Sequence, residues 1–424
     1  MALRVLLVTF VTSVLVAGCA CGPTSGEDGG LDAGGEEDAS VDAGRPDAGR
    51  PDAGVDAGEP DAGEADAGEL DDGGCRYRLT AVAAPWTTGR PLSLELADLN
   101  GDGHLDFIVA TTSTLEVRLN DGQGAPIAPG MSGPLTPLTL VVNDVDGDGL
   151  LDVVAVDVSG TLTLLAGDGD GGLSVQARLD AGRPFFVPLE TAMADLDLDG
   201  RADFVTVDVG GSVPELITVR GQFDGGAPRA SRGSRRLVLA DVTGDGLIDA
   251  LVGNAQYGLT VHPGDGDGGF GASTVFLGST AVNAVALADV TGDGVPDAVC
   301  STGSYDGTTG LISGAGVSVL PGIDGGFGAP LGTPNGRDII WALVLADMNR
   351  DGLLDAVTTR LAFDGGVDVL AVDGGAFSLL ARVGSRNGWA LAVGDLNEDG
   401  WPDVAVGEGA GSNGEVRVLL GSCQ

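Results

Sequence analysis

The sequence has few of the side chains on which enzymes rely. No lysine occurs in its 424 residues, so the 21 basic residues are all arginines, and His104 and His262 are the two histidines. Schiff-base chemistry on lysine is therefore excluded, and general acid–base catalysis by histidine has little support. The 62 acidic residues bring the formal net charge to -41, which excludes a nucleic-acid binder driven by counterion release. We expect a protein that is not an enzyme and has no nucleic-acid partner.

Catalytic motifs are missing as well. The sequence contains neither a G-x-S-x-G nucleophile elbow nor a phosphate-binding loop with a Gly-Lys pair. Aromatic residues make up 4% of the chain, whereas hydrophobic residues make up 43%, a share typical of globular proteins. Glycine, at 74 residues, is more than twice as frequent as its usual share of about 7%. Much of the chain should therefore fold, with many turns.

The first 18 residues have the pattern of a secretory signal peptide. Arg4 precedes an apolar run from Val5 to Val16, which is too short for a comfortable transmembrane span. The ending Leu-Val-Ala-Gly before Cys19 resembles the bacterial lipobox, which implies that Cys19 is lipidated and becomes the mature N-terminus. Ala20 replaces the Asp that favours inner-membrane retention, so the resemblance implies anchoring at the bacterial outer membrane or cell surface. A plain signal peptide with a chance cysteine is the alternative.

Residues 19–74 form a low-complexity segment. The triplet Asp-Ala-Gly recurs between Asp42 and Gly68 with Pro and Glu between the copies, and Arg45 and Arg50 are its two cations. This composition cannot form a core, and its excess of negative charge extends the chain. We predict a disordered acidic tether between the lipidated end and the folded residues 75–424.

An internal repeat runs through residues 75–424 and determines the expected fold. Each copy is a nonamer of the form D-x-[DNT]-x-D-G-x-x-D between two apolar runs. The seven copies, numbered here as loops 1 to 7, occupy residues 98–106, 144–152, 195–203, 241–249, 289–297, 347–355 and 395–403. Consecutive copies start between 46 residues (Asp98 to Asp144) and 58 residues (Asp289 to Asp347) apart. A repeat of this length has room for four short strands.

The apolar runs around each loop predict antiparallel strands. Large apolar residues at alternate positions, such as Leu94 and Leu96, precede each loop, and a second run such as residues 107–110 follows it. A third strand leads into a Gly-rich hairpin, for instance residues 265–270, from which a fourth strand returns. Four strands repeated seven times predict an all-β fold, a seven-bladed β-propeller of four-stranded blades whose closure protects the blade edges. A calcium-binding β-solenoid is the alternative, although its repeats are far shorter.

The nonamers resemble the FG-GAP/VCBS repeat family, whose calcium-loop blades also occur in the integrin α head. The resemblance covers residues 77–421 and rests on seven regularly spaced matches. It implies a propeller with one calcium loop per blade, and so up to seven Ca²⁺ ions.

The nonamer also suits Ca²⁺ chemically. Alternate side chains on a tight loop direct oxygen atoms to one point from positions 1, 3, 5 and 9, a backbone carbonyl is expected from position 7, and Gly at position 6 permits the turn. The expected ligands are, at position 1, Asp98, Asp144, Asp195, Asp241, Asp289, Asp347 and Asp395; at position 3, Asn100, Asp146, Asp197, Thr243, Thr291, Asn349 and Asn397; at position 5, Asp102, Asp148, Asp199, Asp245, Asp293, Asp351 and Asp399; at position 7, His104, Leu150, Arg201, Leu247, Val295, Leu353 and Trp401; and at position 9, Asp106, Asp152, Asp203, Asp249, Asp297, Asp355 and Asp403.

The loops differ in the strength expected of each site. Acidic turns without metal would leave three or four carboxylates repelling one another, and Mg²⁺ demands a stricter octahedron than Ca²⁺. Loops 2 and 3, with four Asp each, should bind most tightly, and loops 4 and 5, with Thr at position 3, less tightly. Loop 6 is the least certain site, because Arg350 adds a cation at position 4.

A second candidate site lies on the face opposite the loops. In this strand assignment many arginines and aromatic residues fall at the strand ends away from the loops. The residues expected to bind a ligand there are Trp86, Arg183, Arg236, Tyr305, Trp341 and Trp389. Planar aromatic rings beside guanidinium groups suit sugars, acidic glycans or a protein partner. The alternative is that these residues cap strand ends and pack between blades.

The two chain ends predict how the ring closes. The last repeat supplies three strands before the chain ends, while residues 77–83 form a strand that belongs to no complete blade. Pairing these ends completes the last blade and places Cys75 opposite Cys423, so we predict a disulfide between them in an oxidising compartment. Two unpaired cysteines at frayed ends are the alternative. Cys300, on a strand, is expected to be a buried free thiol.

Taken together, these patterns predict a calcium-stabilised propeller outside the cytoplasm that recognises a glycan or a cell-surface protein, or mediates adhesion. The lipid on Cys19 would hold it to the membrane. An enzyme that acts on polysaccharide or lipid, and a purely structural envelope protein, are the alternatives. The enzyme would need a pocket on the Arg-rich face with two carboxylates free of metal ligation.

Overall fold

The computed structural model describes residues 66–67, 76–82, 85–124, 126–133, 135–180, 188–208, 215–219, 229–232, 236–254, 258–278, 280–306, 311–331, 339–361, 365–384, 386–410 and 413–423. The predicted signal peptide, Cys19, Cys75, Arg183 and nearly all of the tether lie outside these residues. The described residues belong to one compact unit. The part of the chain that the structure describes contains no helix long and apolar enough to cross a membrane.

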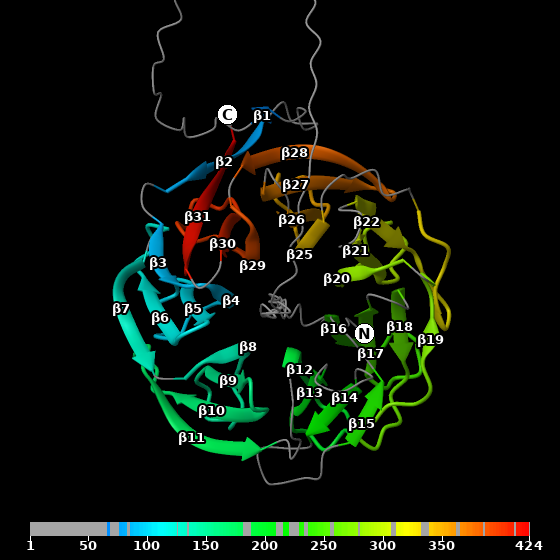
Figure 1. The fold of residues 1–424 in the computed structure, drawn as a ribbon, viewed down its shortest axis with the longest axis horizontal. Helices are drawn as coiled ribbons and strands as arrows, with labels where there is room; N and C mark the ends of the chain where they lie inside the picture. The colour runs from blue at the N-terminus through cyan, green and yellow to red at the C-terminus, as the bar shows by residue number, and fades with distance from the viewer. Residues whose placement is uncertain are drawn as a thin grey trace, which may run out of the picture. The chain divides into compact units, whose positions relative to one another are not determined.

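The secondary-structure elements of the described residues are all β-strands. Their sheets are arranged around a central axis (Figure 1). From the axis outward, the first three sheets are β4 (Pro91–Ala97), β5 (Asp106–Thr111), β6 (Leu115–Asn120) and β7 (Pro126–Gly133); β8 (Pro137–Asn143), β9 (Asp152–Asp157), β10 (Thr161–Gly167) and β11 (Leu173–Asp180); and β12 (Pro188–Ala194), β13 (Asp203–Asp208), β14 (Glu215–Val219) and β15 (Arg229–Arg232). The next sheets are β16 (Arg236–Ala240), β17 (Asp249–Asn254), β18 (Gly258–His262) and β19 (Thr274–Val275); β20 (Val282–Ala288), β21 (Asp297–Asp306) and β22 (Leu311–Leu320), followed by the hairpin β23 (Gly322–Ile323) and β24 (Gly326–Phe327); and β25 (Ile339–Ala346), β26 (Asp355–Leu361), β27 (Gly366–Asp373) and β28 (Ala376–Gly384), with β1 (Asp66–Ala67) at its edge. The last sheet, called here the terminal blade, contains β29 (Gly388–Gly394), β30 (Asp403–Ala410) and β31 (Asn413–Cys423), with β2 (Tyr77–Ala81) and β3 (Trp86–Gly89) from the other end of the chain.

The sheets form a closed ring. The inner strands β4, β8, β12, β16, β20, β25 and β29 each contact the next, and β29 contacts β4. Six of the sheets have four or more strands, which confirms the predicted all-β propeller. The sheet β20–β22 has three strands among the described residues, with a bridge from Val319 to Leu331 beyond them. The count of seven four-stranded blades therefore stays a prediction.

The core lies between neighbouring blades rather than inside one of them. Both faces of an inner strand carry apolar side chains, so each sheet packs against the sheets on either side. In one such layer Ile108 and Val117 of the first sheet pack with Leu140 and Val153 of the second. The ring therefore depends on every interface in turn, including the one where the chain ends meet.

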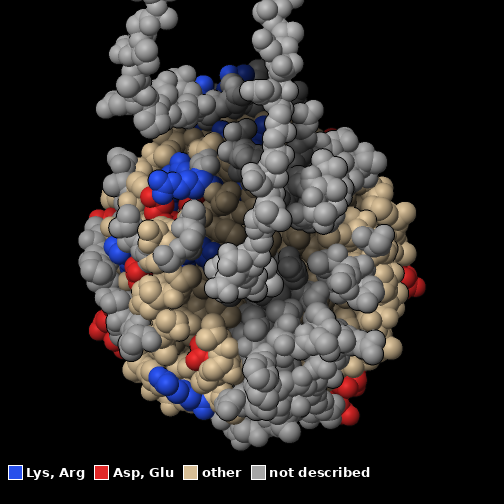
Figure 2. Space-filling model, viewed as in Figure 1, with Lys and Arg blue, Asp and Glu red and all other residues tan. Residues whose placement is uncertain are grey.

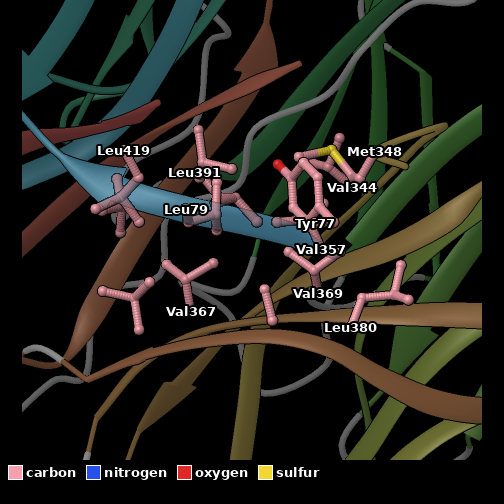
Figure 3. Packing of buried hydrophobic residues seen from close by; sticks show 14 of the residues in the cluster. Tyr77, Leu79, Val344, Met348, Val357, Val367, Val369, Leu380, Leu391 and Leu419 are labelled. Atoms are coloured by element: carbon pink, nitrogen blue, oxygen red, sulfur yellow. The ribbon is translucent and has the colours of Figure 1, made fainter. Parts of the chain in front are cut away.

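The terminal blade is closed by both ends of the chain, as predicted. Strand β2 pairs antiparallel with the end of β31, with Leu79 opposite Gly421. Figure 3 shows Tyr77 and Leu79 of β2 packed among residues of the neighbouring sheet such as Val357 and Val369. The sequence analysis did not foresee that β3 continues this outer strand and pairs with the beginning of β31. The blade edge is thus covered along most of β31.

Candidate functional site

Each candidate metal loop wraps around the carboxylate at its position 1. In loop 1 the N–H groups of Gly101 and Gly103 donate to the two oxygens of Asp98, over 2.7 and 2.9 Å. The bond from the position 6 amide recurs in all seven loops, with lengths of 2.8 to 3.1 Å. Glycine at position 6 has a positive φ in every loop, between 83° and 93°. This conformation favours glycine, which confirms the predicted turn.

The carboxylate at position 5 has one oxygen engaged in the loop. Its Oδ1 accepts the N–H of position 7 in all seven loops, over 2.7 to 2.9 Å, as from His104 to Asp102. This hydrogen bond lowers the pKa of Asp102, so its carboxylate stays ionised. The backbone N–H groups therefore hold the carboxylates of positions 1 and 5 in place within each loop.

The two loops with four aspartates are those in which carboxylate atoms converge. Ligand atoms of Asp144, Asp146 and Asp148 lie within 4.8 Å of one another, and in loop 3 the same holds for Asp195, Asp197 and Asp203. These acidic groups could hold a metal ion. That these two sites bind most tightly stays a prediction.

The threonine loops contain polar atoms without a protein partner. The hydroxyl oxygens of Thr243 and Thr291, at position 3 of loops 4 and 5, are buried and have no hydrogen-bond partner. The Oδ1 atom of Asp395, at position 1 of loop 7, is in the same situation. Buried polar atoms are rarely left unpaired. A cation bound at the expected ligand positions would satisfy all three, so the residues present fit a metal ion.

The aspartate at position 9 also connects the loop to the blade. Its Oδ2 accepts the N–H of position 2 in all seven loops, over 2.8 to 3.0 Å. Burial, and then nearby aspartates, raise the pKa of Asp355 and of Asp403 to about 7. A bound cation would counter this shift, because an adjacent positive charge favours the ionised carboxylate.

A glycine after the third strand is a feature that the sequence analysis missed. The N–H of Gly167, Gly264, Gly322 and Gly421 donates to the Oδ1 of the position 9 aspartate of the same blade, over 2.7 to 3.0 Å. A Cβ on any of these glycines would lie 2.2 to 2.4 Å from the carbonyl oxygen of loop position 8. The loop backbone therefore approaches too closely for any other residue. In these four blades the glycine stands 15 to 25 residues after the position 9 aspartate, and this recurrence is the signal that could have revealed it; in the first blade the N–H of Asn120 donates to Asp106 instead.

On the opposite face, Trp341 and Trp389 form a pair below the surface. Their ring centroids are 5.6 Å apart in an edge-to-face arrangement, and their residues are 4% and 9% exposed. The Arg90 guanidinium lies 5.0 Å from the centroid of the Trp389 ring, and Arg90 Nε has no hydrogen-bond partner. The structure thus brings together two of the predicted aromatic residues, but both are buried, and the Trp389 ring carries Arg90.

Of the other predicted ligand-binding residues, the structure describes the surroundings of Trp86 alone. Trp86 packs edge-to-face on Phe107 with Arg118 above its ring, 5.4 Å from the centroid. Tyr305 lies on β21 and Arg236 begins β16, and their side chains are outside what the structure describes. Arg183 lies in an undescribed segment. The proposed grouping of all six residues therefore stays a prediction.

Several cations on this face are neutralised by acids. Arg417 contacts both oxygens of the buried Glu408 over 2.7 and 2.8 Å. Asp368 pairs with Arg360 and Arg382 over 3.2 and 2.7 Å. Figure 2 shows basic side chains next to acidic ones over the terminal blade, with further acidic side chains around the rim. Much of the positive charge on this face is therefore compensated within the protein.

The cysteines follow the expected pattern where the structure describes them. Cys423 is disulfide-bonded. Its predicted partner Cys75 lies outside the described residues, so the pairing stays a prediction. Cys300 is a buried free thiol, as predicted, and burial raises the pKa of this thiol.

A cavity of about 550 Å³ lies at the loop-side ends of the inner strands of four neighbouring blades. Its walls include Leu96, Val142, Met193 and Val393, with Glu95 and Asp195 among its polar groups. The acid Asp195 belongs to loop 3. The cavity is thus on the loop face and not on the face where an enzymatic pocket was considered.

These features define a class of protein: a β-propeller with an acidic, glycine-containing loop between the first and second strand of its repeats. Family models agree with this description. The model of FG-GAP-like repeats matches residues 98–155, 144–206 and 241–300, and that of the FG-GAP repeat matches residues 387–419. The chain therefore contains FG-GAP repeats at these residues, which confirms the resemblance noted from the sequence.

Proteins that are similar to this chain include one curated relative and two solved structures of one complex. Integrin alpha-PS5 of Drosophila melanogaster is 33% identical over 96 residues, which span 19% of this chain and 10% of the integrin. Two crystal structures of BBS1N in complex with ARL6DN cover 80% and 81% of this chain and 97% and 98% of theirs, with TM-scores of 0.55 and 0.54 and identities of 11% and 12%. At such low sequence identity the two structures support the fold alone.

Proposed function

We propose that this protein is a calcium-stabilised propeller outside the cytoplasm that recognises a glycan or protein ligand, and that it has no enzymatic activity. The FG-GAP propeller favours a ligand-binding or adhesion-type function. The observation that carries the proposal is the repeated loop. The same hydrogen bonds from backbone N–H groups to its carboxylates recur in all seven copies, and the hydroxyl oxygens of Thr243 and Thr291 have no hydrogen-bond partner.

Calcium suits these loops better than magnesium. Each loop offers oxygen donors at positions 1, 3, 5 and 9 and a carbonyl at position 7, and Ca²⁺ accepts six to eight oxygens in flexible geometry. The residues that would hold it are the ligands named above, loop by loop. When bound, the ion would supply positive charge that offsets the clustered carboxylates.

Calorimetric titration of the full chain with CaCl₂ tests the ion. A double variant, Asp146→Asn with Asp148→Asn, should remove one binding event, because it leaves loop 2 with two of its four acidic side chains. Asp170→Asn is the control: it changes an exposed acid in the β10–β11 hairpin, outside the loops. Equal calcium stoichiometry in all three proteins would count against the proposal, as would preference for MgCl₂.

The recognition site is proposed around Arg90, on the face opposite the loops. The Nε of Arg90 has no hydrogen-bond partner, and its guanidinium lies on the Trp389 ring. Arg386, which is exposed, precedes Trp389 by three residues at the start of the terminal blade. Guanidinium groups held on aromatic rings suit carboxylate- or sulfate-bearing glycans and acidic protein surfaces. The Trp pair would act as a rigid support for this contact.

A glycan array and a cell-envelope extract probed with the calcium-loaded protein test recognition. Arg90→Ala should lose at least about tenfold in affinity, which corresponds to about 1.4 kcal/mol. Arg178→Ala, an exposed arginine on β11, should bind as the parent does. If the parent binds nothing in either assay, a structural role in the envelope is favoured instead. Turnover of a polysaccharide or lipid by the parent would favour the enzymatic alternative.

The lipid anchor is proposed from the lipobox-like residues before Cys19. Metabolic labelling with a radioactive fatty acid should mark the parent and not Cys19→Ala, and the variant should leave the membrane fraction. A membrane-bound, unlabelled parent protein would contradict this assignment.

A further inference from the structure

Position 4 of the candidate metal loops requires an unusual backbone conformation. In loops 1, 2, 4 and 5 this position is glycine, with φ between 72° and 78°. The other three loops carry Leu198, Arg350 and Glu398 there, with φ of 59°, 63° and 57°. These three are the non-glycine residues with positive φ in the described part of the chain. A side chain with a Cβ is strained in this region, and a contact made by that side chain can offset the cost.

Arg350 makes such a contact across a blade interface. Its guanidinium lies 5.2 Å from the centroid of the Trp401 ring, which is at position 7 of the next loop. A Cβ on Gly400 would lie 3.1 Å from Arg350 Nη1, so the guanidinium rests closely on the backbone of loop 7. Arg350 therefore joins loop 6 to loop 7.

Glu398 makes the corresponding contact one interface further on. Its Oε1 lies 2.5 Å from Nδ1 of His104, which is at position 7 of loop 1. In both cases a residue at position 4 reaches position 7 of the next loop around the ring. Leu198 has the same strained backbone, but its side chain is 64% exposed. The strained backbone at position 4 therefore also occurs where the side chain is exposed, so Leu198 can serve as a reference for the strain alone.

Both contacts flank the terminal blade. Loop 7 belongs to this blade, loop 6 precedes it and loop 1 follows it. Trp401 also lies beside Tyr77 of the closing strand β2, with ring centroids 6.3 Å apart. We propose that Arg350 and Glu398 form a clasp on each side of the terminal blade, which holds to its two neighbours the blade that is assembled from both ends of the chain. This inference does not depend on the proposed calcium sites or on a ligand.

Three single substitutions to glycine, at Leu198, Arg350 and Glu398, test the clasp. Each is made in the full chain and measured with and without CaCl₂. Leu198→Gly relieves strain without losing a contact and should raise the melting temperature, Tm, by about 1 to 2 °C. Arg350→Gly and Glu398→Gly relieve the same strain but lose the clasp, and each should melt below Leu198→Gly. If either melts at or above the Tm of Leu198→Gly, the proposal for that residue is wrong. Because the comparison is also made without calcium, it can fail or succeed whatever the loops bind.

A double-mutant cycle provides a second measurement for variants that fold poorly. Glu398→Gln and His104→Gln each remove one partner, and the double variant removes both. Their Tm shifts should be non-additive, since the second change costs little once the first is made. Additive shifts would overturn the clasp between loops 7 and 1.

Discussion

The Tyr77 hydroxyl donates a hydrogen bond to the Pro402 carbonyl over 3.1 Å, between residues 325 positions apart in the sequence. Tyr77 is 3% exposed, and its burial raises the pKa of the phenol, so the group remains a donor at neutral pH. Pro402 directly precedes Asp403, the last residue of loop 7. The contact therefore joins the N-terminal closing strand to loop 7 of the terminal blade.

Replacing this hydroxyl should weaken ring closure by a modest amount. Tyr77→Phe keeps the ring and leaves the Pro402 carbonyl without this donor, which should lower the free energy of unfolding by about 1 kcal/mol. Tyr77→Ala should lose about 3 to 5 kcal/mol, because a cavity remains among the residues in Figure 3. Urea unfolding measures both. A Phe variant as stable as the parent would show that the hydrogen bond contributes nothing.

Glycine after the third strand should be required. In Gly264→Ala the new Cβ would lie 2.4 Å from the carbonyl oxygen of Ile248, and the expected loss is about 1 to 3 kcal/mol. Gly384→Ala is the matched control, because nothing lies within 4 Å of a Cβ there, and it should change stability by no more than about 1 kcal/mol. Equal effects of the two substitutions on urea unfolding would refute the close approach.

His262 should make stability depend on pH. Its side chain is buried on β18, and burial lowers its pKa from 6.5 to about 4. Since the folded-state pKa lies below the unfolded-state value, the unfolded chain binds more protons between these limits. Stability is then complete above about pH 6.5 and falls by up to about 3 kcal/mol as the pH drops toward 4.

The contribution of His262 is measured as the difference in the free energy of unfolding between the parent and His262→Gln at each pH. His262→Gln should flatten the dependence on pH between 6.5 and 4. Because the chain has two histidines, NMR titration can follow each ring directly. A His262 ring that titrates near 6.5 in the folded protein would contradict the assignment.

The bond at Cys423 should link the two chain ends. Non-reducing peptide mapping of the exported protein is expected to recover Cys423 joined to Cys75. Cys423 joined to Cys21, or free thiols at Cys75 and Cys423, would exclude this closure.

Much of the fold follows from the spacing of the acidic nonamers. A repeat of about 50 residues with a fixed loop between two apolar runs dictates four-stranded blades. The closing strand was also predictable, because residues 77–81 had no other partner. Strand β3 was not, since Trp86 and its neighbours precede Pro91 and carry no alternation that separates a short strand from a loop.

The site was predictable at the level of the loop and not of its surroundings. Loop residues lie within nine positions of one another, so their spacing fixes their geometry. The contacts of Arg350 and Glu398 depend on which loop follows in the ring and which side chain occupies its position 7, which are long-range facts. For the same reason the sequence suggested exposed tryptophans, whereas Trp341 and Trp389 cover each other across two blades.

The central claim, that calcium in the loops holds the propeller together, is tested most directly by differential scanning calorimetry of the full chain in CaCl₂ and in excess EGTA. Each filled site should add about 2.7 kcal/mol when free calcium is about 100 times its dissociation constant, or about 4 °C of Tm for a folded part of this size. We predict a Tm that falls by several such steps in EGTA and returns when calcium is restored. An unchanged Tm in EGTA would contradict the account.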